Sequence, residues 1–292
     1  MARGADRPAP GRSGQAWHVP AAAAAVALLA LLAGCAGGTA SVPGPGAGPM
    51  RQALRDWAAF PAGATPRPLV LTGPPVADPA SGFPSGDAKL AYLEGALNLP
   101  AALPSGPAAA AGFPLITARE ATQILRSVAT KGPPVTARLT VTGVRLGTAV
   151  FDTDRGPRKL PAWLFGLAGV RDPAGVLAVA DSRIFVPRGR AANPRPFVDD
   201  ARLGRGGRTL TVRFTGAPSG TGPCTASYSA TQVASRAAVA VAVKEHAHGG
   251  TVACAAVGYP RRVTVALAAP LGGRVLVDAA SGVAVTVLPA GP

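Results

Sequence analysis

The feature that most constrains the fold is a succession of short segments in which apolar and polar residues alternate. In residues 135–151 (VTARLTVTGVRLGTAVF), the apolar positions Val135, Leu139 and Val141 alternate with threonine and arginine. Alternation with a period of two is typical of a strand with one buried and one solvated face. Similar segments occupy residues 160–167, 176–186, 208–215, 225–232, 236–244, 261–267, 274–278 and 283–288. We therefore predict a mainly β fold, with antiparallel sandwich or barrel-like units and one or two short helices.

The strongest helical pattern follows a capping box formed by Thr117 and Glu120. In this pattern the threonine hydroxyl accepts a hydrogen bond from a free amide of the first turn, and the glutamate reaches back to the cap. One apolar face follows, made of Ala121, Ile124, Leu125 and Val128. The pattern ends at the breaker KGPP, residues 131–134.

Two other segments have shorter or mixed patterns. Residues 50–60 carry Leu54, Trp57 and Ala58 at helical spacing, which predicts a short helix that docks on the body of the protein. Residues 90–99 (LAYLEGALNL) fit either period. The interior Gly95 and the prolines that follow favour a strand.

Changes in composition suggest where the chain divides. Residues 36–49 are uncharged and rich in glycine and proline, which is typical of a flexible tether. Residues 187–206 interrupt the alternation with proline, glycine, arginine and the acidic pair Asp199-Asp200, which we interpret as a domain boundary or a long surface loop. The predicted organisation is a signal peptide at 1–34, a tether at 35–49, an N-terminal α+β or mainly β domain at 50–187, and a small C-terminal β domain at 207–292.

The first residues of the chain have the layout of an export signal. Arginines and a single acid precede the uncharged apolar run of residues 21–33, which is too short to span a hydrocarbon core of about 30 Å. The segment Leu32-Ala33-Gly34-Cys35 then resembles the lipobox of bacterial lipoproteins. This resemblance implies cleavage before Cys35, acyl chains on its thiol, and a protein held at the extracytoplasmic face of the cell membrane. An ordinary secretory peptide or an uncleaved anchor remains the alternative.

With Cys35 assigned to lipid, Cys224 and Cys254 are the two remaining cysteines. An even pair in an oxidising compartment predicts a disulfide. Closing a loop of about 30 residues contributes roughly 3 to 4 kcal/mol in the chain-entropy model. Metal ligation by the two thiols is the weaker alternative, because the sequence has no C-x-x-C spacing.

The C-terminal tail carries a second resemblance. Cys224, the stretch AVAVAVKEHAHGG and the stretch PLGGRVLVDAASGVAV (270–285) are similar to the tail of uncharacterised secreted proteins and lipoproteins of high-GC Gram-positive bacteria. The resemblance implies a compartment and a class, and it brings no activity, cofactor or catalytic residue with it.

The chain is strongly basic, with a formal net charge of +15, and arginine supplies 25 of its 29 basic residues. A GC-rich coding sequence explains this usage, whereas attraction to anionic wall polymers or lipid headgroups is the functional interpretation. We do not expect nucleic acid as a partner, because the chain is exported and no basic run is interleaved with aromatic residues.

Few residues suggest catalysis. His246 and His248 lie two apart, so on a strand they share a face and are weak candidates for a metal site, although no third ligand has a recognisable spacing. Asp152 and Asp154 in DTDRG are weak candidates for calcium binding or for acid–base work, and turn formation explains both. Neither G-x-S-x-G nor S-x-x-K occurs.

These observations favour an exported, lipid-anchored cell-envelope protein that works as a binding or structural module. We expect no cofactor, and as partners the membrane, through the lipid on Cys35, and anionic envelope polymers. The alternative is an extracellular hydrolase whose active site comes from scattered loop residues, and the sequence leans against an enzyme.

Overall fold

The computed structural model describes residues 47–127, 136–189, 197–250 and 252–290. The predicted signal peptide, Cys35 and most of the predicted tether lie outside these residues. The chain divides into units 1–38 and 39–292, and all described residues belong to the second unit. Strands predominate in this part of the chain, so the predicted mainly β fold is confirmed. The predicted boundary between 50–187 and 207–292 stays a prediction.

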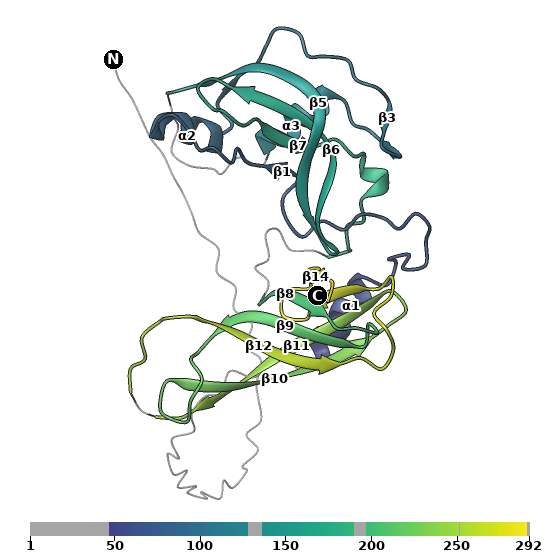
Figure 1. The fold of residues 1–292 in the computed structure, drawn as a ribbon, viewed down its shortest axis with the longest axis vertical. Coiled ribbons are helices and arrows are strands. Elements are labelled where there is room, and N and C mark those ends of the chain that lie inside the picture. Colours follow the sequence, from purple (N-terminus) through teal and green to yellow (C-terminus); the bar gives the residue numbers. More distant parts are fainter. Residues whose placement is uncertain (1–46, 128–135, 190–196, 251, 291–292) are drawn as a thin grey trace, which may run out of the picture. The chain divides into compact units, whose positions relative to one another are not determined.

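A five-stranded sheet forms the first layer of the fold (Figure 1). Its strands, in spatial order, are β1 (Val76–Ala77), β7 (Ala174–Leu177), β6 (Gly156–Leu167), β5 (Leu139–Thr153) and β2 (Leu97–Asn98). The consecutive strands β5, β6 and β7 pair antiparallel, as the short connections predict, whereas β2 lies parallel to β5. A separate two-stranded ribbon pairs β3 (Ala109–Ala110) with β4 (Phe113–Pro114).

Helix α3 (Ala118–Ser127) confirms the predicted capping box. The Thr117 amide donates to Glu120 Oε2 at 2.7 Å, and the Glu120 amide donates to Thr117 Oγ1 at 3.2 Å. The Thr117 amide and the Thr117 hydroxyl both donate to the Glu120 carboxylate, and these two bonds lower the pKa of Glu120. Ala121 and Leu125 of the predicted apolar face are buried, whereas Val128 lies outside the described residues.

The prediction of a strand at residues 90–99 is wrong for its first half. Helix α2 (Gly86–Leu93) occupies this stretch, and the Ser85 hydroxyl caps it by accepting a hydrogen bond from the Ala88 amide. Gly95 has φ +63°, so it ends the helix in the left-handed conformation instead of lying inside a strand. The strand that follows is the two-residue β2. Farther along, the stretch predicted as a strand at 176–186 contains the end of β7, isolated bridges at Val179 and Ile184, and the short helix η1 (Asp181–Arg183).

Two further sheets pack face to face and confirm the predicted sandwich. One contains β10 (Thr225–Ala234), β11 (Ala238–His248) and β13 (Val275–Asp278). The other contains β12 (Tyr259–Ala266), β9 (Thr209–Gly216), β8 (Val198–Leu203) and β14 (Thr286–Leu288). Apolar side chains from both sheets form one buried core. Two of the pairings, β11 with β13 and β8 with β14, are parallel.

Strand β8 (Val198–Leu203) corrects the interpretation of the last part of residues 187–206 as a long surface loop, whereas the domain boundary stays a prediction. Val198 and Ala201 are buried against the sandwich core, so the segment has a strand face. The pairing with β9 shifts register between Val198 and Asp200, which places two residues of β8 opposite one of β9. Because of this bulge, the buried residues Val198 and Ala201 are three positions apart instead of two. The alternation with a period of two that predicts a strand is therefore absent from this segment.

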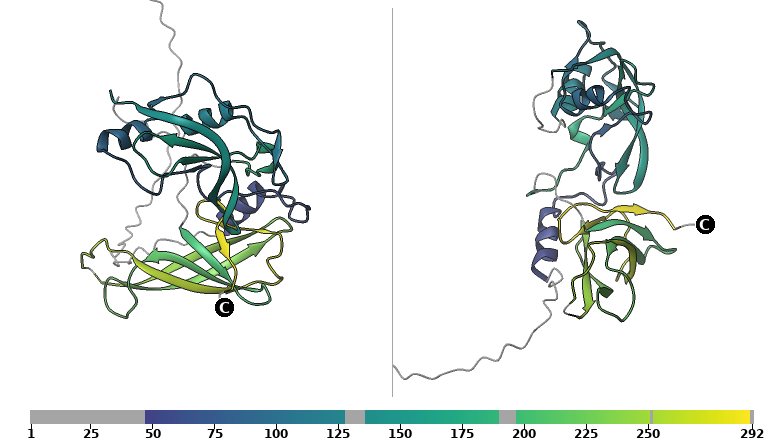
Figure 2. Two further views of the ribbon diagram at one scale, coloured as in Figure 1. Left: turned by 45° about the horizontal axis from the view of Figure 1, so that its top comes forward. Right: turned by 90° about the vertical axis from the view of Figure 1, so that its left-hand side faces the viewer.

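The AVAVAV run of β11 is buried on both faces. Val239, Val241 and Val243 face the sandwich core, whereas the alanines between them belong to a second cluster with helix α1 (Ala47–Asp56). Figure 2 shows this helix along the outside of the sheet. Small alanine side chains let the helix approach the strands closely.

Helix α1 begins earlier than predicted, inside the stretch taken as tether, and its buried face also differs from the prediction. Met50 and Ala53 are buried with Trp57, while Ala58 is exposed. The Trp57 indole donates to the Gly282 carbonyl at 2.9 Å, which fastens the end of this segment to the turn after β13. Docking of this segment is therefore confirmed.

Candidate functional site

A groove of about 350 Å³ lies on the five-stranded sheet. Its lining comes from β5, β6 and the segment before β7, namely Thr142, Gly143, Val144, Arg145, Leu164, Gly166, Arg171 and Pro173. One face of this sheet is covered by the core that contains Trp163, Phe165 and α3. On the opposite face a smaller cluster around Phe151 and Leu160 covers one end. The groove lies toward the other end of β5 and β6.

Glycines form the floor of the groove. Gly143 and Gly166 are opposite each other in the β5–β6 register, just after a shift in the pairing at Val141. A Cβ atom at Gly143 would meet nothing within 4 Å, so this position opens into free space. A Cβ atom at Gly166 would lie 2.8 Å from Thr142 Oγ1, so only glycine leaves room for that hydroxyl. Glycine inside a strand often marks a place where another group approaches the backbone.

Two arginines give the groove its charge. Arg145 projects from β5 and Arg171 lies in the connection between β6 and β7, and both are exposed. Among the described residues, no ion pair joins either guanidinium to a carboxylate, whereas Arg67, Arg155 and Arg213 all have acidic partners. A guanidinium presents planar donors that suit phosphate and carboxylate oxygens. The groove therefore offers two cations and the Thr142 hydroxyl to an anion.

Sequence reasoning missed both arginines. The available signal was Arg145 on the polar face of a strand with glycines two residues away on either side, at Gly143 and Gly147. Glycine at these positions removes the neighbouring side chains that would otherwise cover the arginine. Arg171 has no comparable local signal.

A second cavity, of about 380 Å³, lies beside the disulfide. The predicted bond between Cys224 and Cys254 is confirmed, with the two Cα atoms 5.5 Å apart. The cavity is lined by Ala217, Pro218, Cys224, Thr225, Glu245, Ala247, His248, Gly249, Gly250, Cys254, Ala255 and Val257. Glu245 Oε2 accepts a hydrogen bond from the Tyr228 hydroxyl at 2.8 Å. Burial, and next this bond, raise the pKa of Tyr228.

His246 and His248 both lie on β11, as the spacing predicts, and each has its own hydroxyl neighbour. His246 Nε2 is 2.8 Å from Ser229 Oγ, and His248 Nε2 is 3.4 Å from Ser227 Oγ. The His248 Nδ1 atom lies 2.7 Å from the Gly220 carbonyl oxygen, to which it donates. Within the described ranges, no group of three or more His, Cys, Asp or Glu side chains is placed to hold a metal ion.

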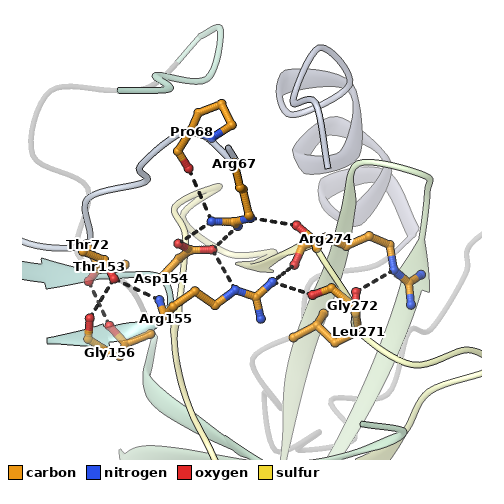
Figure 3. Close-up of polar contacts among 12 residues, drawn as sticks. Arg67, Pro68, Thr72, Thr153, Asp154, Arg155, Gly156, Leu271, Gly272 and Arg274 are labelled. Atoms are coloured by element: carbon orange, nitrogen blue, oxygen red, sulfur yellow. Dashed lines mark hydrogen bonds and ion pairs between the residues drawn. The ribbon is translucent and has the colours of Figure 1, made fainter. Parts of the chain in front are cut away.

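The two weak acidic candidates are separated in the fold. Asp152 is exposed on β5, whereas Asp154 is buried in the β5–β6 turn. Asp154 accepts two hydrogen bonds from Arg67, and Arg155 Nε lies 3.6 Å from Asp154 Oδ2. Figure 3 shows the carboxylate between the two guanidinium groups. Such a carboxylate is held as a structural counter-ion, not presented to a substrate.

The same arginines fasten the β5–β6 turn to the loop before β13. Arg155 Nη2 donates to the Gly272 and Arg274 carbonyls at 2.7 and 2.8 Å, and Arg67 Nε donates to the Gly273 carbonyl at 3.0 Å. The Val287 amide of β14 also donates to the Asp154 carbonyl at 3.0 Å. Burial lowers the pKa of Arg155, and the Asp154 charge opposes that effect. We call this group of Arg67, Asp154 and Arg155 the buried triad.

The acidic pair Asp199-Asp200 lies on β8. Asp200 accepts two hydrogen bonds from Arg213 of β9, so it neutralises a neighbouring charge. Burial and the adjacent Asp200 raise the pKa of Asp199.

No protein-family model, curated protein or solved structure matches this chain. In the described part of the chain, none of the helices is long and apolar enough to cross a membrane. Cys35, the predicted lipidation site, lies outside the described residues.

Proposed function

We propose that this chain is an exported, lipid-anchored protein of the cell envelope that works as a binding or structural module, and that the groove on β5 and β6 contacts an anionic envelope polymer. The observation that carries the proposal is the pair Arg145 and Arg171, which have no ion-pair partner among the described residues and line a groove with a glycine floor. The export signal and the lipobox-like segment before Cys35 support the compartment. The lipid would hold the groove close to the polymers of the envelope.

The shape of the groove suits a chain more than a compact ion. It is an open depression along two adjacent strands, and at Gly143 a ligand can approach the backbone without meeting a side chain. A polymer with repeated anionic groups can contact Arg145 and Arg171 together. The net charge of +15 adds a long-range attraction that salt weakens.

Binding to polyglycerol phosphate and to polyglutamate tests the proposal and separates phosphate from carboxylate recognition. The double variant Arg145→Gln/Arg171→Gln should weaken binding about tenfold at low salt, since exposed ion pairs contribute about 0.2 to 1 kcal/mol each. The matched control is Arg158→Gln/Lys159→Gln, which removes the same charge from exposed positions of β6. If the two double variants lose the same binding affinity, net charge alone explains the effect, and the groove is not the binding site.

A steric variant tests the same surface without changing its charge. Gly143→Val places a side chain in the open space of the groove, and valine is favoured in strands. We expect an unchanged thermal unfolding midpoint and weaker polymer binding. Undiminished binding by this folded variant would place the contact elsewhere.

The lipid anchor has its own test. Cys35→Ser should abolish acylation and release the protein from the membrane fraction into the soluble extracytoplasmic fraction. Persistent acylation or membrane association would refute the lipobox interpretation.

A hydrolase is the second candidate, and one geometric observation favours it. His248 lines the second cavity, its Nδ1 donates to a carbonyl, and its Nε2 faces Ser227 Oγ at 3.4 Å. A base oriented in this way and placed beside a hydroxyl is the start of a nucleophilic site. Labelling by a fluorophosphonate that disappears in Ser227→Ala and persists in Ser229→Ala would support this candidate. Absence of labelling in the folded protein would remove it.

A further inference from the structure

We propose that the Cys224–Cys254 disulfide is a thiol–disulfide exchange site, with an extracytoplasmic dithiol as its reductant, and that its reduction opens the adjacent cavity. The disulfide lies at the surface, because Cys254 is exposed and Cys224 is only half-buried. Both cysteines line the cavity of about 380 Å³. A reductant can therefore reach the bond without unfolding the sandwich. This inference is independent of the arginine groove.

The backbone at Cys224 is strained. Its φ is +66°, in the left-handed region that residues with a side chain rarely adopt. Conformations of this kind cost of order 1 to 3 kcal/mol and gather at functional sites and switch regions.

The disulfide is the main attachment of the segment that carries Cys254. Among the described residues 252–257, the backbone hydrogen bond that forms runs from the Val257 amide to the Ala255 carbonyl, inside the segment itself. The Cys254 sulfur contacts the Val252 carbonyl, also within the segment. By contrast, the start of β10 is fixed independently, because the Ala226 amide donates to the Pro218 carbonyl at 3.0 Å. Reduction should therefore free residues 252–257 and leave the sheet in place.

His248 is placed to assist the exchange. It lines the same cavity, and its Nδ1 lies 3.1 Å from the hydroxyl of Thr225, the residue that follows Cys224. A protonated imidazole at this position can give a proton to the thiolate that leaves. Besides His248 and the two disulfide cysteines, the titratable side chain in the described cavity lining is that of Glu245. It already accepts a hydrogen bond from the Tyr228 hydroxyl.

The exchange proceeds in two balanced steps. A thiolate of the reductant attacks the exposed Cys254 sulfur, which forms a mixed disulfide and breaks the bond to Cys224. Cys224 leaves as a thiolate and takes a proton from His248. The second thiolate of the reductant then attacks its own sulfur in the mixed disulfide, so Cys254 is released and the reductant becomes a disulfide, with two electrons transferred.

The test uses the full chain with Cys35→Ser, so that only one cysteine pair reacts. Dithiothreitol is added at pH 7 without denaturant, and the thiols are trapped with iodoacetamide and measured by mass spectrometry. We expect both Cys224 and Cys254 to be alkylated while the protein keeps a cooperative thermal transition. Hydrogen exchange should increase at residues 252–257 and remain low in β11. A requirement for denaturant, or loss of cooperative unfolding on reduction, would make the bond a structural crosslink and overturn the proposal.

Two histidine variants test the proton donor. His248→Gln should slow reduction by about a hundredfold, the lower end of the range for general-acid assistance. His246→Gln is the matched control, because His246 lies on the same strand and does not line the cavity. Equal rates in the two variants would overturn the role of His248.

Discussion

Replacing Asp154 by asparagine tests whether the buried triad holds the fold together. Asp154 has a side chain that is 2% exposed and pairs with Arg67, which is 22% exposed. Asparagine keeps the size and one acceptor oxygen, but it leaves Arg67 and Arg155 without their negative counter-ion. Breaking a buried pair by removing one partner costs about 3 to 5 kcal/mol, because an uncompensated charge remains.

The exposure of Arg67 to solvent sets the expectation near the lower end of this range. Water reaches part of that guanidinium and replaces some of the lost interaction, so we expect about 3 kcal/mol for Asp154→Asn. For a protein of this size, 1 kcal/mol corresponds to a shift of about 2 to 4 °C in Tm. The variant should therefore unfold about 6 to 12 °C below the parent protein, measured by circular dichroism and checked by urea denaturation.

The matched control is Asp200→Asn. Asp200 also accepts two hydrogen bonds from one arginine, but its partner Arg213 is 55% exposed. Exposed pairs contribute about 0 to 1 kcal/mol, so this variant should lose at most a few degrees. The apolar double variant Arg67→Met/Asp154→Leu should be more stable than Asp154→Asn, because it leaves only Arg155 without its counter-ion, whereas Asp154→Asn leaves both arginines without one. If the two asparagine variants lose the same stability, burial does not govern the triad and the reasoning fails.

Two further predictions concern other buried contacts. A Cβ atom at Gly273 would lie 2.0 Å from the Ala62 carbonyl oxygen, so Gly273→Ala should lower the free energy of unfolding by about 1 to 3 kcal/mol or more, measured by urea denaturation. Gly63→Ala is the control, because a Cβ atom there meets nothing within 4 Å, and it should be neutral or slightly stabilising. Equal effects of the two substitutions would contradict the close contact at Gly273. Burial and the hydrogen bond to Asp78 raise the pKa of Tyr92, so the stability from this phenol is complete below its ordinary pKa of about 10 and falls as the pH rises through the higher folded-state value. Tyr92→Phe should therefore lower the free energy of unfolding by about 1 kcal/mol at pH 8. At pH 11 the difference in stability between the variant and the parent protein should be smaller. A difference that grows at high pH would contradict the raised pKa.

Local patterns predict those parts of the fold in which one face of an element is buried and the other is wet. The capping box at Thr117 and the alternation of Leu139 and Val141 belong to this class, and both are confirmed. The patterns fail where the backbone itself departs from regularity. Gly95 ends a helix through a positive φ, and the bulge at Val198–Asp200 shifts the buried positions of β8. Neither departure can be recognised from the amino-acid composition of its segment.

The groove and the triad could not be predicted for a different physical reason. The role of an ionisable group depends on the partner that the fold brings to it, and Arg67 lies 87 residues from Asp154 in the chain. In the sequence, Asp154 stands in a turn like any other acid, and the glycines two residues to either side of Arg145 do not tell whether a carboxylate lies near it. The fold distinguishes them, because it surrounds Asp154 with two guanidinium groups and leaves Arg145 above glycines without a carboxylate. In a chain whose arginines far outnumber its acids, we expect arginines with a buried carboxylate partner to stabilise the fold. We propose that an anionic ligand binds where arginines in a concave surface have no such partner among the described residues.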